Sequence, residues 1–235
     1  SNATSFGSMF FEASSFNQDL STWDVSSSEY MQHMFYAASN FNSDISTWDV
    51  SNVWNMESMF EGASSFNSDL SSWDVSSVTT MLHMFLRASS FNSDLSSWDV
   101  SNVVNMINMF NGAINFNSDL SSWDVFNVEN MQAMFDNTNL SEENKCAIHS
   151  TWQSNNNWEY DWSSFCQLCP PSNLAGSPTY NSVSLSWGAP GGCENYVINE
   201  LPFYDTGSNV SATDEWPGSG SDDKDIAYKI TVTQT

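Results

Sequence analysis

Basic residues are almost missing from this sequence. Four Lys and Arg residues stand against 28 Asp and Glu residues, which gives a formal net charge of −24 over 235 residues. Arg87 is the sole basic residue before Lys145. Such a surface repels nucleic acid and anionic lipid, so we expect no nucleic-acid partner. Basic proteins, cations and uncharged polymers such as glycans remain as candidate partners.

Long hydrophobic runs are missing as well. No apolar stretch approaches the roughly 20 residues of a membrane-spanning helix, so no membrane insertion is predicted. The hydrophobic fraction of 40% nevertheless excludes general disorder. Glycine-rich phosphate loops are also missing, and most polar residues recur as copies rather than as one distinct acid, base or nucleophile. We therefore expect no catalytic residue, no enzyme activity and no cofactor other than the calcium considered below.

What the chain has instead is a unit of 25 residues that recurs without insertion. Its tryptophan returns at Trp23, Trp48, Trp73, Trp98 and Trp123. A phenylalanine returns at Phe16, Phe41, Phe66, Phe91 and Phe116, and Met-Phe pairs begin at Met9, Met34, Met59, Met84, Met109 and Met134. A fixed period of this length predicts a solenoid, in which each unit buries its apolar face against its neighbours.

One half of the unit predicts a short strand. Leu70, Trp73 and Val75 follow the spacing of a leucine-rich repeat, so Trp73 and Val75 should point inward and Asp74 outward. Parallel strands are therefore expected around the five repeated tryptophans.

The other half predicts an amphipathic helix or its tighter variant, capped by Ser76 or Ser77. Its apolar residues recur at steps of three and four, and we assign the methionines to the core. For the central unit these residues are Val78, Met81, Met84, Phe85 and Ala88.

Asparagine and aspartate rows accompany the apolar ones. We interpret them as a turn whose side chains bond backbone groups of adjacent units. The rows are Asn17, Asn42, Asn67, Asn92 and Asn117, and Asp19, Asp44, Asp69, Asp94 and Asp119.

The run FNSDLSSWDVSNV at residues 91–103, with Met-Phe and Ala following it, resembles the BspA-type leucine-rich-repeat proteins of microbial surfaces. The resemblance covers about residues 4–139. It implies a secreted or surface-attached protein that works by adhesion or partner binding rather than by catalysis. The ligand itself is not identified by it.

The predicted fold is thus an α/β repeat solenoid over residues 4–139, with parallel strands and short helices. Residues 1–3 resemble the remnant of a cleaved expression tag, and the natural protein is expected to be longer. Residues 140–170 should form a cap, in which a helix starts after Ser141 and runs through Trp152. The aromatic residues behind it should cover the end of the solenoid, with a sugar-binding platform as the alternative.

Residues 171–235 predict a small antiparallel β domain of sandwich type, since short alternating stretches are separated by Gly and Pro. The expected strands are residues 182–187, 196–201 and 226–233. The sequences SVSLSWGAP and YKITVTQT resemble the first and last strands of a fibronectin type III module.

Four cysteines lie near the junction, at Cys146, Cys166, Cys169 and Cys193. A redox pair or half of a zinc site would fit Cys166-Gln-Leu-Cys169, but the implied surface location favours structural disulfides. Of the three pairings that the sequence allows, we favour Cys146–Cys166 and Cys169–Cys193.

The outward strand face is the predicted ligand site. Neighbouring carboxylates about 4.8 Å apart would repel by about 3 kcal/mol at an effective dielectric near 20. Hydroxyl hydrogen bonds with solvent, protonation of alternate acids, a partner, or Ca²⁺ at Asp49, Asp74 and Asp99 would each offset this repulsion. The face comprises Asp24, Asp49, Asp74, Asp99 and Asp124, flanked by Thr22, Thr47, Ser72, Ser97 and Ser122 and by Ser26, Ser51, Ser76 and Ser101.

Three functions compete at this point. The first is a cell-surface adhesion module that binds an extracellular protein or glycan through this face. The second is a structural spacer in a larger surface protein, and the third is an ice- or mineral-binding surface. Binding of glycans by this chain would separate the first from the second. The oligomeric state is left open.

Overall fold

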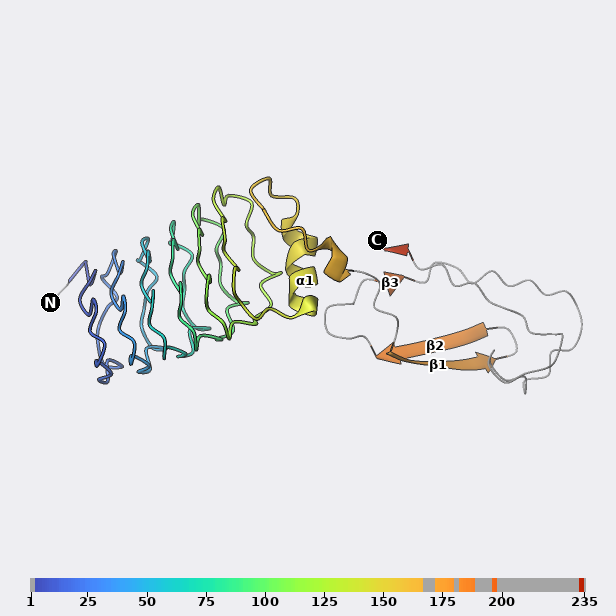
Figure 1. Ribbon diagram of the computed structural model, residues 1–235, viewed down its shortest axis with the longest axis horizontal. Helices are drawn as coiled ribbons and strands as arrows, with labels where there is room; N and C mark the ends of the chain where they lie inside the picture. The colour runs from blue at the N-terminus through green and yellow to red at the C-terminus, as the bar shows by residue number, and fades with distance from the viewer. Residues whose placement is uncertain (1–2, 167–171, 180–181, 189–195, 198–232, 235) are drawn as a thin grey trace, which may run out of the picture. The chain divides into compact units, whose positions relative to one another are not determined.

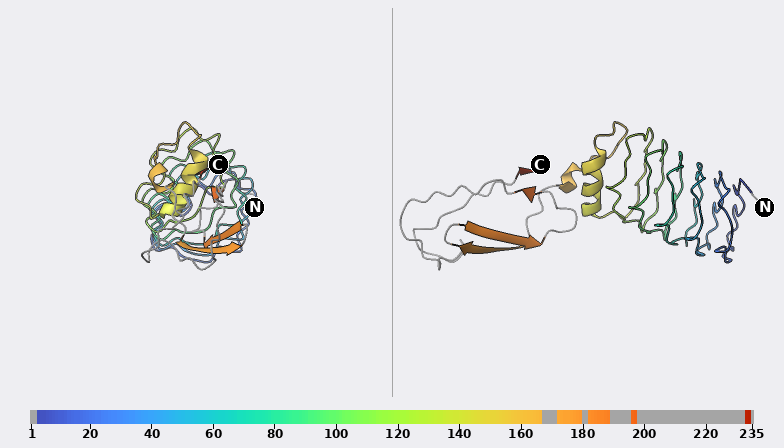
Figure 2. Two further views of the ribbon diagram at one scale, coloured as in Figure 1. Left: turned by 90° about the vertical axis from the view of Figure 1, so that its right-hand side faces the viewer. Right: turned by 180° about the vertical axis from the view of Figure 1, so that it is seen from behind.

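The computed structural model describes residues 3–166, 172–179, 182–188, 196–197 and 233–234. The chain forms two units, Ser1–Gln167 and Leu168–Thr235, which we take separately. In the first unit each 25-residue repeat makes one circuit of the chain, called a rung below, and the rungs lie side by side in chain order (Figures 1 and 2). Between residues 3 and 141 the rungs consist of turns and bends, with no helix or strand.

In the Met-Phe segment, the backbone hydrogen bonds between rungs all point to the following rung. Every second N–H group across the Met-Phe segment donates to a carbonyl of the following rung, as from Met81 to Asn105 at 2.9 Å and from Phe85 to Met109 at 2.8 Å. The N–H groups between them donate within the rung, three residues back, as from Met84 to Met81 at 3.1 Å. The segment therefore satisfies its backbone by alternating local and inter-rung bonds.

The predicted helix in each repeat is wrong. His83 and Arg87 have φ values of 58° and 59°, and equivalent positive values recur in the other rungs. A positive φ at the third residue of a four-residue turn is the mark of a type II turn, and it interrupts a right-handed helix. The spacing of three and four residues therefore belongs to successive turns.

The predicted parallel strands are wrong as well. A parallel strand exchanges bonds with its neighbour in both directions along its length. Here both directions occur only at single positions, as where Met56 donates forward to Thr80 and Thr79 donates back to Trp54, and the rest of the Met-Phe segment donates forward only. Around Trp73 the backbone curls, because the N–H groups of Ser71 and Ser76 donate to the side chains of Asp69 and Asp74. Only isolated parallel bridges remain, at Ser5, Tyr30, Asn55, Thr80, Asn105 and Asn130.

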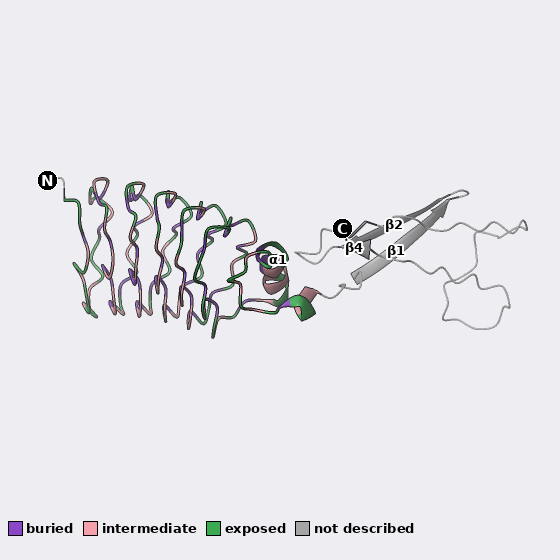
Figure 3. Cartoon of the chain, turned by 90° about the horizontal axis from the view of Figure 1, so that it is seen from above, coloured by how far each residue is buried: buried purple, intermediate pink, exposed green. Residues whose placement is uncertain are grey.

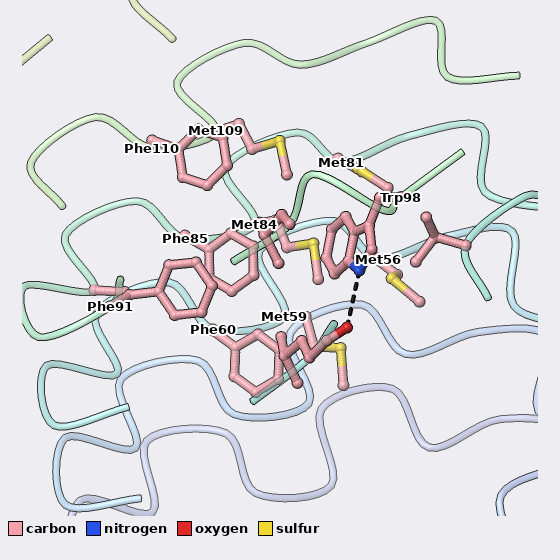
Figure 4. Packing of buried hydrophobic residues seen from close by; sticks show 14 of the residues in the cluster. Met56, Met59, Phe60, Met81, Met84, Phe85, Phe91, Trp98, Met109 and Phe110 are labelled. Atoms are coloured by element: carbon pink, nitrogen blue, oxygen red, sulfur yellow. Dashed lines mark hydrogen bonds between the residues drawn. The ribbon is translucent and has the colours of Figure 1, made fainter. Parts of the chain in front are cut away.

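The buried residues are nevertheless those that the pattern indicated. Trp73 and Val75 are 3% and 1% exposed while Asp74 lies at the surface. Buried positions recur from rung to rung (Figure 3), and their apolar side chains form one cluster. Phe60, Phe85 and Phe110 stack with ring centroids 5.6 Å apart, and methionines fill the space beside them (Figure 4). The first rung departs from the core prediction, since Met9 is 48% exposed and Phe16 and Trp23 are only partly buried.

Four of the five repeated tryptophans also tie their rung to the preceding one. The indole N–H of Trp73 donates to the Ile45 carbonyl at 3.1 Å, and that of Trp98 donates to the Leu70 carbonyl at 2.9 Å (Figure 4). Trp48 and Trp123 repeat this bond. The residue combines apolar burial with a satisfied polar group, which is the condition for burying an indole.

The predicted cap helix is present as α1, Glu142–Trp152. Ser141 caps it, because its hydroxyl accepts a bond from the Asn144 N–H at 3.2 Å. Trp152 is fully buried and stacks on Trp123 with centroids 6.1 Å apart. A 3₁₀ turn, η1, follows at Ser163–Cys166.

The prediction of a C-terminal antiparallel β domain is corrected too. Strand β1, Ser172–Thr179, pairs with β2, Ser182–Gly188, and β3, Tyr196–Val197, pairs with β4, Thr233–Gln234. No sheet of more than two strands occurs in the described parts of this unit. Two separate pairs cannot provide the facing sheets of a sandwich, and the stretch predicted at 226–233 lies mostly outside the described residues.

The two positive-φ positions of each rung generate a first prediction. Gly62 has φ 70°, and a Cβ added to it would meet nothing closer than the Ala37 Cα at 3.5 Å. Gly62→Ala should therefore lower the free energy of unfolding by about 1 kcal/mol through backbone strain alone. Ala37, at φ 53°, occupies the same place one rung earlier, so Ala37→Gly should not destabilise the chain. Urea unfolding followed by circular dichroism tests both, and a neutral Gly62→Ala would contradict the turn geometry.

The indole bond generates a second prediction. Trp73→Ala should cost about 3–5 kcal/mol of unfolding free energy, as other large core truncations do. Trp73→Phe should cost about 1–3 kcal/mol, because it leaves the buried Ile45 carbonyl without its donor. Trp54→Phe is the matched control, since Trp54 is 38% exposed and should change stability by less than about 0.5 kcal/mol. Equal losses for Trp73→Phe and Trp54→Phe would refute a role for the indole N–H.

Candidate functional site

The predicted aspartate row lies on the surface of the rungs. Asp24, Asp49, Asp74, Asp99 and Asp124 are all exposed. In each of them Oδ1 accepts the backbone N–H of the residue two positions later, at 3.0 Å for Asp74 and Ser76. The Ser76 hydroxyl donates to the same oxygen at 2.6 Å. One carboxylate oxygen thus holds the local turn, and the other is left toward solvent.

The flanking hydroxyls have structural partners. Ser72 donates to the Ser46 carbonyl at 2.8 Å, one rung away, and Ser97 donates to the Ser71 carbonyl at the same distance. Thr47 and Ser122 make the equivalent bonds. Because these hydroxyl protons are used between rungs, Thr47, Ser72, Ser97 and Ser122 stabilise the stack more than they offer donors to a ligand, whereas Thr22 of the first rung makes no such bond.

Hydrogen bonding offsets the repulsion within the aspartate row. The hydroxyl of Ser76 and, second, its N–H hold the pKa of Asp74 below its usual value, while the neighbouring Asp99 opposes this. Ser101 lowers the pKa of Asp99 in the same way, and Ser26 lowers that of Asp24. These carboxylates therefore stay ionised at neutral pH.

The sequence predicts the second acidic row only as part of a turn and not as a ligand site. This row comprises Asp19, Asp44, Asp69, Asp94 and Asp119. Asp69 bonds the Ser71 N–H at 2.9 Å, and Asp94 bonds Ser96 similarly. Near the last rungs this row lines a shallow depression formed by Asp94, Ser96, Ser118, Asp119, Ser121 and Ser122. The neighbouring asparagine row bonds between rungs as predicted, as from the Asn92 N–H to Asn67 Oδ1 at 2.8 Å. A depression formed by successive rungs is not visible in the sequence.

Calcium finds no support in this arrangement. Within residues 3–166 and the described strands, no group of three or more His, Cys, Asp or Glu side chains is placed to hold a metal ion. Asp49, Asp74 and Asp99 lie on successive rungs rather than around one point, and each already uses an oxygen for a hydrogen bond.

One polar cluster combines serine, glutamate and histidine. The Ser58 hydroxyl donates to Glu61 Oε2 at 2.7 Å, and His83 Nδ1 lies 3.9 Å from the same oxygen. A nucleophilic serine would instead need its hydroxyl on the histidine. The cluster does not have that arrangement, and the expectation that the chain is no enzyme stays a prediction.

The aromatic cap packs onto the last rung. Trp162 is buried, and the Tyr160 hydroxyl accepts the Phe135 N–H at 2.9 Å while donating to Asp136 at 2.9 Å. Burial raises the pKa of Tyr160. The Glu159 carboxylate accepts the N–H of Ala133. These side chains replace the carbonyls of a following rung, so the cluster serves as a cap rather than as an open sugar platform.

The predicted disulfide between Cys146 and Cys166 is present and joins α1 to η1. The two Cα atoms are 4.9 Å apart, within the usual range. The second predicted disulfide, Cys169–Cys193, lies outside the described residues.

The serine bonds generate a prediction about pH. Ser76→Ala removes the main cause of the low pKa of Asp74, so that pKa should rise toward the ordinary value of about 3.9. A depressed folded-state pKa adds stability above the unfolded-state pKa, and this stability is lost as pH falls through the folded-state value. The variant should therefore lose less stability on acidification below about pH 4. Carboxylate ¹³C NMR titration measures the pKa, with Ser77→Ala as the neighbouring control; an unchanged Asp74 pKa in Ser76→Ala would contradict the assignment.

Comparisons with known proteins match the repeats and the cap. The family model described as "Mycoplasma protein of unknown function, DUF285" matches residues 1–85 and 68–160, more than half of the chain. No curated protein and no solved structure matches the chain. The match is consistent with a surface repeat protein, whereas the leucine-rich-repeat and fibronectin type III resemblances are not shown. No helix in the described parts of the chain is long and apolar enough to cross a membrane. The chain therefore belongs to the family described as Mycoplasma protein of unknown function, DUF285.

Proposed function

We propose that the repeats form a binding module of an extracellular or cell-surface protein, and that the aspartate row holds a basic segment of a partner protein. The observation that carries this proposal is the set of unused carboxylate oxygens. Asp24, Asp49, Asp74, Asp99 and Asp124 each have Oδ1 bonded within the chain and are exposed. They repeat at every rung, which matches a ligand with recurring positive charge.

The partner's charge follows from what surrounds the row. Arg87 and Lys145 are the Lys and Arg residues that the structure describes, and no salt bridge joins either of them to the row. The formal net charge of −24 adds a long-range attraction for cations. Lys and Arg side chains of a partner would relieve the repulsion between neighbouring carboxylates and gain charge-assisted hydrogen bonds.

The ice- or mineral-binding alternative is weaker. A regular hydroxyl surface needs free donors, but Ser72, Ser97 and Ser122 direct theirs to carbonyls of the preceding rung. A structural spacer makes no use of the free carboxylate oxygens, and the experiment below separates it from a binding module.

The test is the affinity of the full chain for a hexa-lysine peptide at low ionic strength, measured by calorimetry. Asp49→Asn/Asp74→Asn/Asp99→Asn should weaken binding about ten-fold, since it removes three exposed ion pairs. The matched control is Asp44→Asn/Asp69→Asn/Asp94→Asn, which makes the same charge change in the second acidic row. Its affinity should stay within about two-fold of the unmodified chain.

Two results would overturn the proposal. Equal weakening by both triple variants would show that net charge alone attracts the peptide. No measurable binding by the unmodified chain would favour the spacer. Melting curves of both variants check that they are folded.

A further inference from the structure

The two sides of each rung differ in how much their residues vary from one repeat to the next. The aspartate row has the same residue at every rung, because each Asp holds an equivalent turn. The opposite half of the repeat carries positions that change at every rung. One of these rows is Tyr36, Glu61, Leu86, Asn111 and Asp136. Packing between rungs does not require a particular side chain at these positions. A binding partner can therefore determine which residues occur there.

Aromatic side chains gather on this variable surface in the first rungs. Tyr30 and Trp54 meet edge to face with centroids 4.8 Å apart, and Trp54 is 38% exposed. Phe11 and Tyr36 stack at 4.6 Å, and Phe11 is 44% exposed. Both pairs lie outside the buried core, where the apolar rows are already filled. Exposed aromatic pairs of this kind mark interaction surfaces.

Each aromatic pair has a glutamate at the equivalent repeat position of a neighbouring rung. The Trp54 N–H donates to the Glu29 carbonyl at 3.1 Å, which places Glu29 beside Trp54 in the same row. Glu61 follows Tyr36 in its row, and the Ser58 hydroxyl holds its carboxylate at 2.7 Å. The surface therefore presents two aromatic pairs, each with a glutamate at the same repeat position one rung away from one of its rings.

We propose that these two aromatic–carboxylate pairs form a second binding surface, which takes two basic side chains of a partner protein. A ring face attracts a cation, and a neighbouring carboxylate adds an ion pair to the same group. Arginine fits best, because its planar guanidinium stacks on a ring while it donates to a carboxylate. The strong negative charge of the chain favours this cationic ligand over a neutral glycan. The proposal does not depend on the aspartate row.

The experiment uses the full chain that carries Asp49→Asn/Asp74→Asn/Asp99→Asn, so that the aspartate row contributes little. Its affinity for hexa-arginine is compared with that for hexa-citrulline, which has the same shape without the charge. Tyr36→Ser/Trp54→Ser, added to this background, should weaken hexa-arginine binding about ten-fold, and hexa-citrulline should bind weakly to both.

A second variant keeps the rings and removes the charge. Glu29→Gln/Glu61→Gln should weaken hexa-arginine binding by at least about three-fold while leaving the melting temperature nearly unchanged. Val104→Ser/Ile114→Ser is the matched control, since both side chains are exposed and apolar but lie outside the aromatic pairs. It should bind as the background chain does.

The results decide between ligand classes. Equal binding of hexa-arginine and hexa-citrulline, or loss of binding in the Val104→Ser/Ile114→Ser control, would overturn the proposal. A neutral oligosaccharide that binds through Tyr36 and Trp54 but is insensitive to Glu29→Gln/Glu61→Gln would identify a glycan site instead. Failure of the hexa-lysine test on the aspartate row would leave this surface unaffected, because the background already lacks the three central aspartates of that row.

Discussion

The structure depends on the backbone hydrogen bonds of the Met-Phe segment, which run in one direction from each rung to the next. Met81 and Phe85 donate forward to Asn105 and Met109, and the pattern repeats at each rung. Aligned peptide groups add their dipoles, as they do in a helix. The last rung therefore ends in N–H groups that need acceptors, and the cap supplies the Glu159 carboxylate and the Tyr160 hydroxyl. The cap therefore supplies acceptors for the N–H groups of the last rung and also covers its apolar side chains.

The other half of each rung is held by side chains rather than by a backbone ladder. Trp73 and Ser72 donate to carbonyls of the preceding rung, and asparagine oxygens accept N–H groups of the following one. This explains why the repeated polar residues vary so little. Such a surface has few groups left for a ligand, chiefly the carboxylate oxygens of the two acidic rows that accept no backbone N–H. Recognition of a specific partner then falls to the variable positions, where the aromatic pairs lie.

The apolar spacing predicted burial well and secondary structure badly. Trp73 and Val75 point inward and Asp74 outward, because alternation along an extended segment separates the two sides whether or not a strand forms. The steps of three and four that suggested a helix arise here from type II turns at His83 and Arg87. Both structures bring such residues to one side, and they differ only in where the N–H groups donate.

The sequence by itself therefore determined the period, the buried residues and the helix Glu142–Trp152, whose cap and acidic first turn are local signals. Only the tertiary structure decided that the rungs lack strands and helices, and that hydroxyls such as that of Ser72 serve the stack. It also brought Tyr30 to Trp54 and Phe11 to Tyr36. The reason is physical: these partners lie about one repeat apart in the chain, so their contact exists only once the rungs are stacked.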